Sequence, residues 1–358
     1  MSKVAIILGT RPEIIKLASL IKEFQKNNID FTLVHTNQHY SKNMDSLFFE
    51  ELNLPPPDYN LGVGSASHAE QTSKILSSLE DLFSKNKPSL MIVHGDTNTT
   101  LGGALYSSKV GVPIAHVEAG LRSYDRRMPE EINRIITDHV SKLLFAPTEE
   151  TSLNLLKEGV NKSKIHVVGN TIVDAIKANS KKVGHWKTKS EYILITVHRP
   201  ANVDVKENII GFLEILKSIR DLCNHKIIFP IHPRTLSNIK HFNLLNDFNS
   251  LDIDLIDPVG YFRFLDLQKN AKCIVTDSGG IQEEACILGV PCITLRENTE
   301  RPETISVGSN HLVGLNNSKF REIFKRLSTS DKEHWTNPFG DGNSGKSIFN
   351  ILEKEGYF

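Results

Sequence analysis

Residues 272–303 read KCIVTDSGGIQEEACILGVPCITLRENTERPE, and the fold prediction starts from their pattern. The apolar run at 273–275 predicts a buried strand, and apolar residues at helical spacing over 281–288 predict a helix that Gly289 ends. Residues 290–295 predict the next strand. A strand, a short loop, a helix and a second strand make up a βαβ unit, from which parallel sheets are built.

The loop DSGG at 277–280, between this strand and this helix, is suited to binding an anion. The unpaired N–H groups of a first helical turn point outward, and glycine allows a phosphate to approach the backbone. Glu283 and Glu284, one turn into the helix, suit hydroxyl groups rather than more phosphate. From this stretch alone, an ordinary turn capped by Ser278 is the alternative interpretation.

Strand and helix patterns alternate along most of the chain. Helical spacing is clearest at 12–25 and 208–220, whereas the polar stretch 181–190 lacks it and predicts a linker. Repeated βα units predict parallel sheets with helices on both faces. Two series of such units predict two doubly wound domains, with a ligand between them at the carboxyl ends of the strands. The other predicted strands are 4–8, 31–36, 90–94, 114–117, 143–146, 165–168, 192–197, 226–229 and 253–256.

Composition limits the class of protein. A chain of 358 residues exceeds one usual core, so two domains are expected, and the 39% hydrophobic and 23% charged residues are typical of a soluble globular protein. Basic and acidic residues balance at 42 each, which leaves no net field to attract nucleic acid or an acidic membrane. No apolar run reaches the roughly 18 residues of a membrane span. Four cysteines without CxxC spacing indicate reduced core residues and a cytoplasmic protein.

Charged side chains gather where the predicted strands end. Pro12 favours a helix start, so Arg11 and Lys16 can project from one helix N-terminus towards a common cleft. A carboxylate beside small residues at a strand end, as at Glu118, suits a binding site. Ordinary interpretations exist for each candidate: exposed cations, a helix cap at Asp96, or first-turn charges favoured by the helix dipole. The candidates are Arg11, Lys16, Asp96, Glu118, Glu130 and His198.

Three other motifs do not fit the structural context that they require. GDGNSGKS at 340–347 matches the GxxxxGK[ST] phosphate loop, but no strand pattern precedes it, so a cap of the last helix is favoured. No GxGxxG follows a predicted strand, which argues against a dinucleotide site. Asp96, Glu118, Glu130 and His198 could surround a divalent ion, but no HExxH or compact Asp/His cluster supports a metal centre.

Seven motifs occur in order along the chain: GTRPEIIK (9–16), HGDT (94–97), HVEAGLRS (116–123), PEEINR (129–134), VHR (197–199), TDSGGIQEEA (276–285) and TERPE (299–303). Together they resemble the non-hydrolysing UDP-N-acetylglucosamine 2-epimerases over essentially the whole chain. The resemblance implies an isomerase with an α/β fold of two doubly wound Rossmann-like domains facing a cleft, the glycosyltransferase-B type. The N-terminal domain, 1–170 joined by the helix 344–358, would carry the catalytic acids, and the C-terminal domain, 171–343, would bind UDP.

The resemblance also implies roles for single residues. Asp96, Glu118 and Glu130 match the family's acidic catalytic positions, and Lys16 and His198 match its basic ones. Which carboxylate serves which face of the sugar stays open.

The nucleotide is expected on the second domain. Residues 278–280 would hold the diphosphate, with Arg11 and Arg301 balancing its charge because a guanidinium matches phosphate oxygens. Glu284 would accept from the ribose hydroxyls, and the uracil would lie against Phe264. The full set of implied substrate-binding residues is Arg11, Lys16, Asp96, Glu118, His198, Val259, Phe264, Ser278, Gly279, Gly280, Glu284 and Arg301.

In the family, the C2 proton of the sugar leaves as UDP departs, and UDP then adds back to 2-acetamidoglucal with a proton on the other face. This route needs acid/base groups for both faces and stabilisation of the departing UDP, but no metal and no cofactor. The implied partners are UDP-N-acetylglucosamine and UDP, with no nucleic acid and no membrane, and the resemblance implies a homodimer.

Some positions depart from the family pattern. The family often has glutamine at the position of Val259, so only a main-chain contact transfers there, and many relatives have glutamate at the position of Ala201. Gln38 and His39 match residues that hold a second, activating substrate molecule in bacterial members. The arginine expected near residues 67–68 is missing, which leaves regulation by substrate open.

Other functions share parts of this pattern. A glycosyltransferase of the same architecture would have a similar nucleotide half, but its acceptor domain has no reason to contain GTRPE and HVEAGLRS. A nucleotide-sugar sensor without catalysis does not explain so many acid/base groups. A hydrolysing epimerase, which releases free N-acetylmannosamine and UDP, remains an alternative.

Overall fold

The computed structural model describes residues 4–37, 48–180, 191–329 and 334–358. The predicted linker at 181–190, as well as Gln38 and His39, lies outside the described residues. The chain divides into two compact units. Unit 1 comprises Met1–Lys177 and Phe339–Phe358, and unit 2 comprises Ala178–Pro338.

Unit 1 is a seven-stranded parallel sheet in the order β3-β2-β1-β4-β5-β6-β7. Its strands are β1 (Val4–Leu8), β2 (Phe31–His35), β3 (Tyr59–Asn60), β4 (Leu90–His94), β5 (Ile114–Val117), β6 (Leu143–Ala146) and β7 (Ile165–Val167). Its helices are α1 (Arg11–Lys26), α3 (His68–Phe83), α4 (Asn98–Val110), α5 (Pro129–Val140), α6 (Glu149–Lys157), α7 (Thr171–Ala178) and α16 (Ser344–Lys354), with the 3-10 turn η1 (Lys162–Lys164).

Unit 2 is a six-stranded parallel sheet in the order β10-β9-β8-β11-β12-β13. Its strands are β8 (Tyr192–Thr196), β9 (Lys226–Pro230), β10 (Ile253–Ile256), β11 (Cys273–Thr276), β12 (Cys292–Thr294) and β13 (Asn310–Leu312). Its helices are α8 (Pro200–Val203), α9 (Lys206–Leu222), α10 (Pro233–His241), α11 (Leu245–Asn249), α12 (Tyr261–Lys269), α13 (Gly279–Leu288), α14 (Pro302–Ser306) and α15 (Asn317–Thr329).

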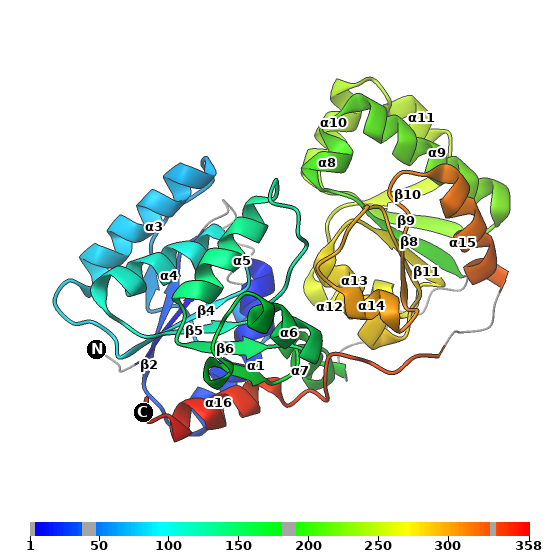
Figure 1. The fold of residues 1–358 in the computed structure, drawn as a ribbon. Coiled ribbons are helices and arrows are strands. Elements are labelled where there is room, and N and C mark those ends of the chain that lie inside the picture. The colour runs from blue at the N-terminus through cyan, green and yellow to red at the C-terminus, as the bar shows by residue number, and fades with distance from the viewer. Residues whose placement is uncertain (1–3, 38–47, 181–190, 330–333) are drawn as a thin grey trace. The chain divides into compact units, whose positions relative to one another are not determined.

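Each unit has three layers, with its sheet in the middle (Figure 1). In unit 1, α3, α4 and α5 pack together on one face, while α1 and α16 pack on the other. In unit 2, α9 and α15 cover one apolar core, and α12 and α13 cover a second core on the opposite face. Because both faces are covered, the central strands are mostly apolar, and every residue of β1, β4 and β8 is buried.

The predicted strands and the doubly wound fold are confirmed, with element ends that move by one or two residues. Within residues 272–303 the chain forms β11 and then α13, which Gly289 ends as expected. The sequence pattern did not predict β3 or β13, because these strands of two and three residues lack an apolar run.

The first unit ends later than predicted and resumes earlier. Helix α7 belongs to unit 1 and not to the second domain, because Asp174 in α7 accepts from the backbone N–H groups of Ser344 and Gly345 at 3.2 and 2.9 Å. Phe339 is buried, and its carbonyl accepts from the Asn170 N–H at 2.9 Å. The limits at 170 and 344 are therefore replaced by 177 and 339.

The GDGNSGKS segment is not a phosphate loop. No strand occurs in the described residues 334–339 before it, and the first N–H groups of α16 are already bonded to Asp174. The cap of this helix thus comes from α7 and not from the glycine-rich segment itself.

None of the helices in the described part of the chain combines the length and the apolar character that a membrane span needs.

Gly345 should be essential for the packing of α16 on α1. A Cβ atom there would lie 2.5 Å from Ser19 Oγ and 2.8 Å from the Ser19 carbonyl carbon. We therefore expect Gly345→Ala to lower the free energy of unfolding by about 1–3 kcal/mol, the usual cost of overpacking. Urea denaturation followed by circular dichroism measures this. Lys346→Ala, one residue on and exposed, should change it by less than about 0.5 kcal/mol. Equal stability of the two variants would contradict this role of Gly345.

Candidate active site

The candidate residues of unit 1 follow neighbouring strands of its sheet. Arg11 and Lys16 lie on α1 after β1, Asp96 follows β4, and Glu118 follows β5. Since β1, β4 and β5 are adjacent and parallel, their carboxyl ends meet at one edge. Glu130 lies at the start of α5, the helix that follows the Glu118 loop.

Lys16 and Glu118 form a buried ion pair, with 7% of each side chain exposed. The Nε2 atom of His94, at the end of β4, lies 3.3 Å from the same Glu118 oxygen, and His94 is 3% exposed. A buried carboxylate requires a partner, because desolvation strongly disfavours an isolated charge. Lys16 supplies that partner, and Glu118 thereby remains compatible with its apolar surroundings.

The backbone of Glu118 is left-handed, with φ of 70°. This conformation is uncommon for residues other than glycine, and such strain persists only where the surrounding structure enforces it. Here the N–H groups of Glu118 and Ala119 both donate to the Phe145 carbonyl at 3.1 Å. The strained backbone therefore supports a functional role for Glu118 beyond packing.

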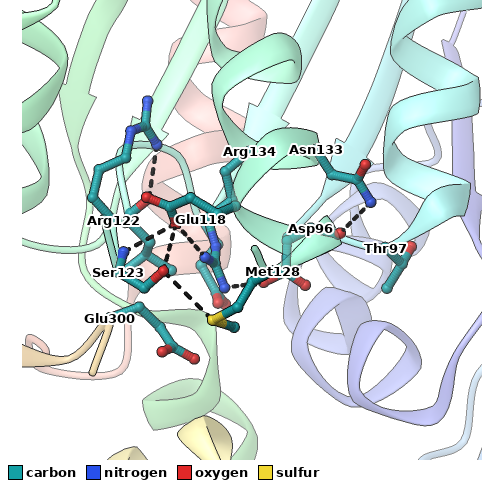
Figure 2. A network of polar contacts seen from close by, with 12 residues as sticks. Asp96, Thr97, Glu118, Arg122, Ser123, Met128, Asn133, Arg134 and Glu300 are labelled. Carbon is teal, nitrogen blue, oxygen red and sulfur yellow. Dashed lines mark hydrogen bonds and ion pairs between the residues drawn. The ribbon is translucent and has the colours of Figure 1, made fainter. Parts of the chain in front are cut away.

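Asp96 is held by α5, as Figure 2 shows. Arg134 donates to the Asp96 carboxylate at 2.5 Å, and the Asn133 side chain donates to the Asp96 carbonyl at 2.9 Å. The cap of α4 is Thr97, whose hydroxyl accepts from the Thr100 N–H. The alternative interpretation of Asp96 as a helix cap is therefore wrong.

The two adjacent acids at the start of α5 differ in environment. Glu131 is buried and accepts from the backbone N–H groups of Ser123 and Tyr124 and from Arg134. It therefore fixes the loop that contains Ser123 and Tyr124. Glu130 is half-buried, and among the described residues its side chain has no protein partner. Glu130 is thus the acid that a ligand can reach without displacing an internal bond.

Three buried side chains, His116, Asp138 and Arg122, form a network that supports the loops containing Asp96 and Glu118. His116 on β5 contacts Asp138 through Nδ1 at 2.7 Å and the Gly95 carbonyl through Nε2 at 2.8 Å. Asp138 also pairs with Arg122 at 2.8 Å. Burial opposes ionisation of Asp138, but His116 and Arg122 outweigh it and hold the pKa of Asp138 below its usual value.

In unit 2, His198 follows β8 and is anchored by Asp277 at the end of β11. The Asp277 carboxylate accepts from the backbone N–H groups of His198 and Arg199 at 3.1 and 2.8 Å. The His198 ring lies with Nδ1 3.3 Å from Asp277 and packs on His232. Burial lowers the pKa of His198, as do Arg199 and Arg234, while Asp277 acts in the opposite direction.

The predicted anion-binding turn forms the start of α13, with Ser278 at the N-cap position. A Cβ atom at Gly279 would lie 2.5 Å from Glu300 Oε1, so a larger residue there would displace that carboxylate. Glu300 pairs with Arg296 at 2.8 Å and with Arg199 at 3.4 Å. Around Gly280, in contrast, a Cβ atom would meet nothing within 4 Å, so this side of the turn is open.

The predicted diphosphate-binding Arg301 is almost buried, with 4% exposed, and it pairs with Glu283 of α13. Glu283 is fully buried in this pair, so the expectation that it contacts ligand hydroxyl groups is wrong. The side chain of Arg199, which the prediction did not include as a binding residue, is 24% exposed beside the same turn.

Only 9% of Glu284, the predicted ribose-binding residue, is exposed. The Gln268 side chain, on α12, donates to it at 2.5 Å. Phe264 and Val259 are partly buried and pack against the core that α12 and α13 share. The structure therefore places Val259, Phe264 and Glu284 around one region of unit 2.

Metal-ligand groups do not cluster in the part of the chain that the structure describes: no three His, Cys, Asp or Glu side chains there could hold a metal ion together. Asp96 and Glu118 instead have cationic partners, Arg134 and Lys16.

Two doubly wound parallel α/β units in one chain define the glycosyltransferase-B fold class, which confirms the predicted class. Within it, the family model described as UDP-N-acetylglucosamine 2-epimerase matches residues 22–353, and the chain belongs to that family. The UDP-N-acetylglucosamine 2-epimerase of Methanocaldococcus jannaschii is 54% identical over 361 residues, which cover 98% of each chain. The enzyme of the same name from Methanococcus maripaludis is 53% identical over 363 residues, with 98% of each chain covered.

A solved structure gives the same result. The M. jannaschii UDP-GlcNAc 2-epimerase in complex with UDP-GlcNAc and UDP superposes with a TM-score of 0.93 at 53% sequence identity. The match covers 98% of this chain and 99% of that chain.

Sequence reasoning missed several residues that hold the candidate site together. Arg134 stands four residues after Glu130 in the PEEINR motif, and this helical spacing could have indicated that it shares a face with that acid. Asp277 and Gln268 had no comparable signal, because their contacts lie 79 and 16 residues away along the chain.

Asp138→Asn should destabilise the protein most near neutral pH. The depressed pKa means that the carboxylate contributes stability above its usual value of 3.8, and that this contribution is lost as the pH falls through the lower folded value. Breaking one partner of a buried pair costs about 3–5 kcal/mol. Urea denaturation at pH 7 and pH 3 should therefore show a large difference from the wild type that shrinks in acid.

Glu158→Gln is the matched control, because Glu158 pairs with the same Arg122 but is 27% exposed. Its cost should not exceed about 1 kcal/mol. A deficit for Asp138→Asn that is equal at both pH values would show that the ionised state of Asp138 contributes nothing.

Proposed function

We propose that this protein interconverts UDP-N-acetylglucosamine and UDP-N-acetylmannosamine by inversion at C2. The observation that carries the proposal is the buried, strained Glu118 with its Lys16 partner, within a chain that is 54% identical to a UDP-N-acetylglucosamine 2-epimerase over nearly its full length. An acid held in this way suits proton transfer at a fixed point in space.

The chemistry follows from the substrate. No carbonyl acidifies the C2 proton, so direct removal and return would be slow. In the proposed route, a base takes the C2 proton while the C1–O bond to UDP breaks, which gives 2-acetamidoglucal and UDP. UDP then adds to C1 and a proton is delivered to the opposite face of C2, so atoms and charge balance.

The acids of unit 1 are proposed to serve the two faces of C2. Glu118 and Asp96 have fixed cationic partners, Lys16 and Arg134, which hold the two carboxylates in constant positions. Glu130 has no partner among the described residues, which supports a role in direct exchange of a proton with the substrate.

Unit 2 is proposed to hold UDP and to stabilise its departure. The side chain of Ser278, the first N–H groups of α13 at 279–280 and the guanidinium of Arg199 are proposed to favour the anionic charge that builds on the diphosphate. His198 stands beside them on the Asp277 anchor. Arg11 of unit 1, at the first position of α1, and Arg301 are proposed to add to the balance of charge.

The nucleoside is proposed to contact Phe264 and the backbone at Val259, with Glu284 accepting from the ribose hydroxyls. The hydrogen bond from Gln268 supports this role of Glu284, because it fixes the orientation of a carboxylate that is 9% exposed. We also propose that the protein is cytoplasmic and acts as a homodimer. Four cysteines without a disulfide support the first statement, and family membership supports the second.

Proton NMR in deuterium oxide tests the reaction and its route together. Incubation of UDP-N-acetylglucosamine with the protein should produce UDP-N-acetylmannosamine with deuterium at C2, because the returning proton comes from solvent. Small amounts of UDP and 2-acetamidoglucal should accumulate. A product that retains its original C2 hydrogen would refute elimination, free N-acetylmannosamine would indicate the hydrolysing reaction, and no turnover would favour a transferase or a sensor.

Replacement of Asp96, Glu118 or Glu130 by the corresponding amide should slow turnover roughly a hundredfold, the usual scale for a lost acid/base group. Glu130→Gln is the most direct of these tests, since it removes no internal partner among the described residues. Glu149→Gln is the matched control, an exposed acid in the first turn of α6. Steady-state rates should fall for the variants of the three acids but not for the control. A Glu130→Gln rate equal to that of the control would exclude an acid/base role of Glu130.

A further inference from the structure

Each sheet has one place where the order of strands reverses direction. In unit 1 it lies between β1 and β4, and in unit 2 between β8 and β11. The helices that follow these two strands cover opposite faces, so the neighbouring loops diverge as they leave the sheet. Diverging loops need a specific interaction if the side chains that they carry are to keep a fixed separation.

In unit 1 a single carboxylate connects the two loops. Glu13, on α1, is 2% exposed. One of its oxygens accepts from the backbone N–H groups of Gly9 and Thr10 at 2.8 Å each. The other accepts from the Thr97 hydroxyl, in the loop after β4, at 2.8 Å and lies 3.3 Å from the Thr100 hydroxyl, in the first turn of α4.

In unit 2 a second carboxylate also connects the two loops, but it belongs to the segment after the other strand of the pair, β11. Asp277, at the end of β11, is fully buried. It accepts from the backbone N–H groups of His198 and Arg199 and from the side chain of Asn202, all in the segment that follows β8. Asn202 also donates to the Leu295 carbonyl at 3.0 Å.

We propose that Glu13 and Asp277 are positioning residues for the reaction, each of which fixes the two diverging loops of its own sheet. Glu13 fixes the position of Lys16, which lies on the same helix, relative to Asp96, which precedes Thr97. Asp277 sets His198 and Arg199 against the turn that begins at Ser278. The inference rests on the proposed function for the roles of these neighbours, but the loop contacts themselves do not depend on it.

The two carboxylates differ in their donors, and this difference gives a sharp test. One Glu13 oxygen meets only hydroxyl donors, and a hydroxyl can rotate and accept instead. Glutamine can therefore place its NH₂ group there and keep the connection. The His198 N–H contacts both Asp277 oxygens, so either orientation of an asparagine sets its NH₂ group against a backbone N–H that cannot reverse.

The experiment compares Glu13→Gln, Glu13→Ala and Asp277→Asn in the full chain. Glu13→Gln should keep kcat within about threefold of the wild type, whereas Glu13→Ala and Asp277→Asn should lower it roughly a hundredfold, as expected for misplaced reacting groups. For Glu13→Ala the KM for UDP-N-acetylglucosamine should change little, because the nucleotide is proposed to lie on unit 2. Asp277→Asn should also weaken the binding of UDP, measured by calorimetry.

Hydrogen exchange measures the protection of the backbone N–H groups in these loops and does not depend on turnover. Asp277→Asn should accelerate exchange in the segment 197–203, and Glu13→Ala should accelerate it at 8–13, since the affected N–H groups lose their acceptor. Glu13→Gln should leave both segments as in the wild type. If the wild type shows no epimerase activity, the proposed function fails, while these exchange rates still decide the inference.

Two results would overturn the inference. Glu13→Gln that loses as much activity as Glu13→Ala would assign the effect to charge rather than to loop positioning. Asp277→Asn with wild-type exchange at 197–203 and full turnover would show that the contacts are dispensable. If Asp277→Asn fails to fold, Asn202→Ala removes one donor to the same carboxylate, and a variant with no change in either readout would count equally against the proposal.

Discussion

The buried ion pair between Lys16 and Glu118 is the interaction on which the site of unit 1 depends. Its partners lie 102 residues apart in sequence, yet each is only 7% exposed on its side chain. An acid at that depth without a cation would be strongly destabilising. The left-handed backbone of Glu118 adds a further cost, which the surrounding contacts must offset.

The same matching of buried charges recurs through both units. Asp138 pairs with Arg122 and Glu283 with Arg301, so some of the 42 acidic and 42 basic residues are paired in the interior. A network of this kind is rigid, because each charge lost would leave another unpaired. Rigidity of the surroundings is what the proposed reaction, with two proton-transfer steps at one carbon, would require.

Against this paired background, a small number of polar groups remain accessible. Glu130 is half-buried without a partner among the described residues, and the side chains of His198 and Arg199 retain 40% and 24% exposure. The open side of the turn at Gly280 belongs to the same set. These are the groups that the proposed function assigns to direct contact with the nucleotide-sugar.

The sequence by itself determined the α/β class, the two series of βα units, the family and most of the residues of the candidate site. This was possible because strand and helix periods are local properties, and because residues that follow parallel strands must gather at one sheet edge. Only the tertiary structure decided how those residues are paired. Arg134 on Asp96, Asp277 beneath His198 and Glu283 within the Arg301 pair follow from contacts between distant segments, which no local pattern encodes. The limits of the units were decided in the same way, since α7 contacts α16, which lies 170 residues further along the chain.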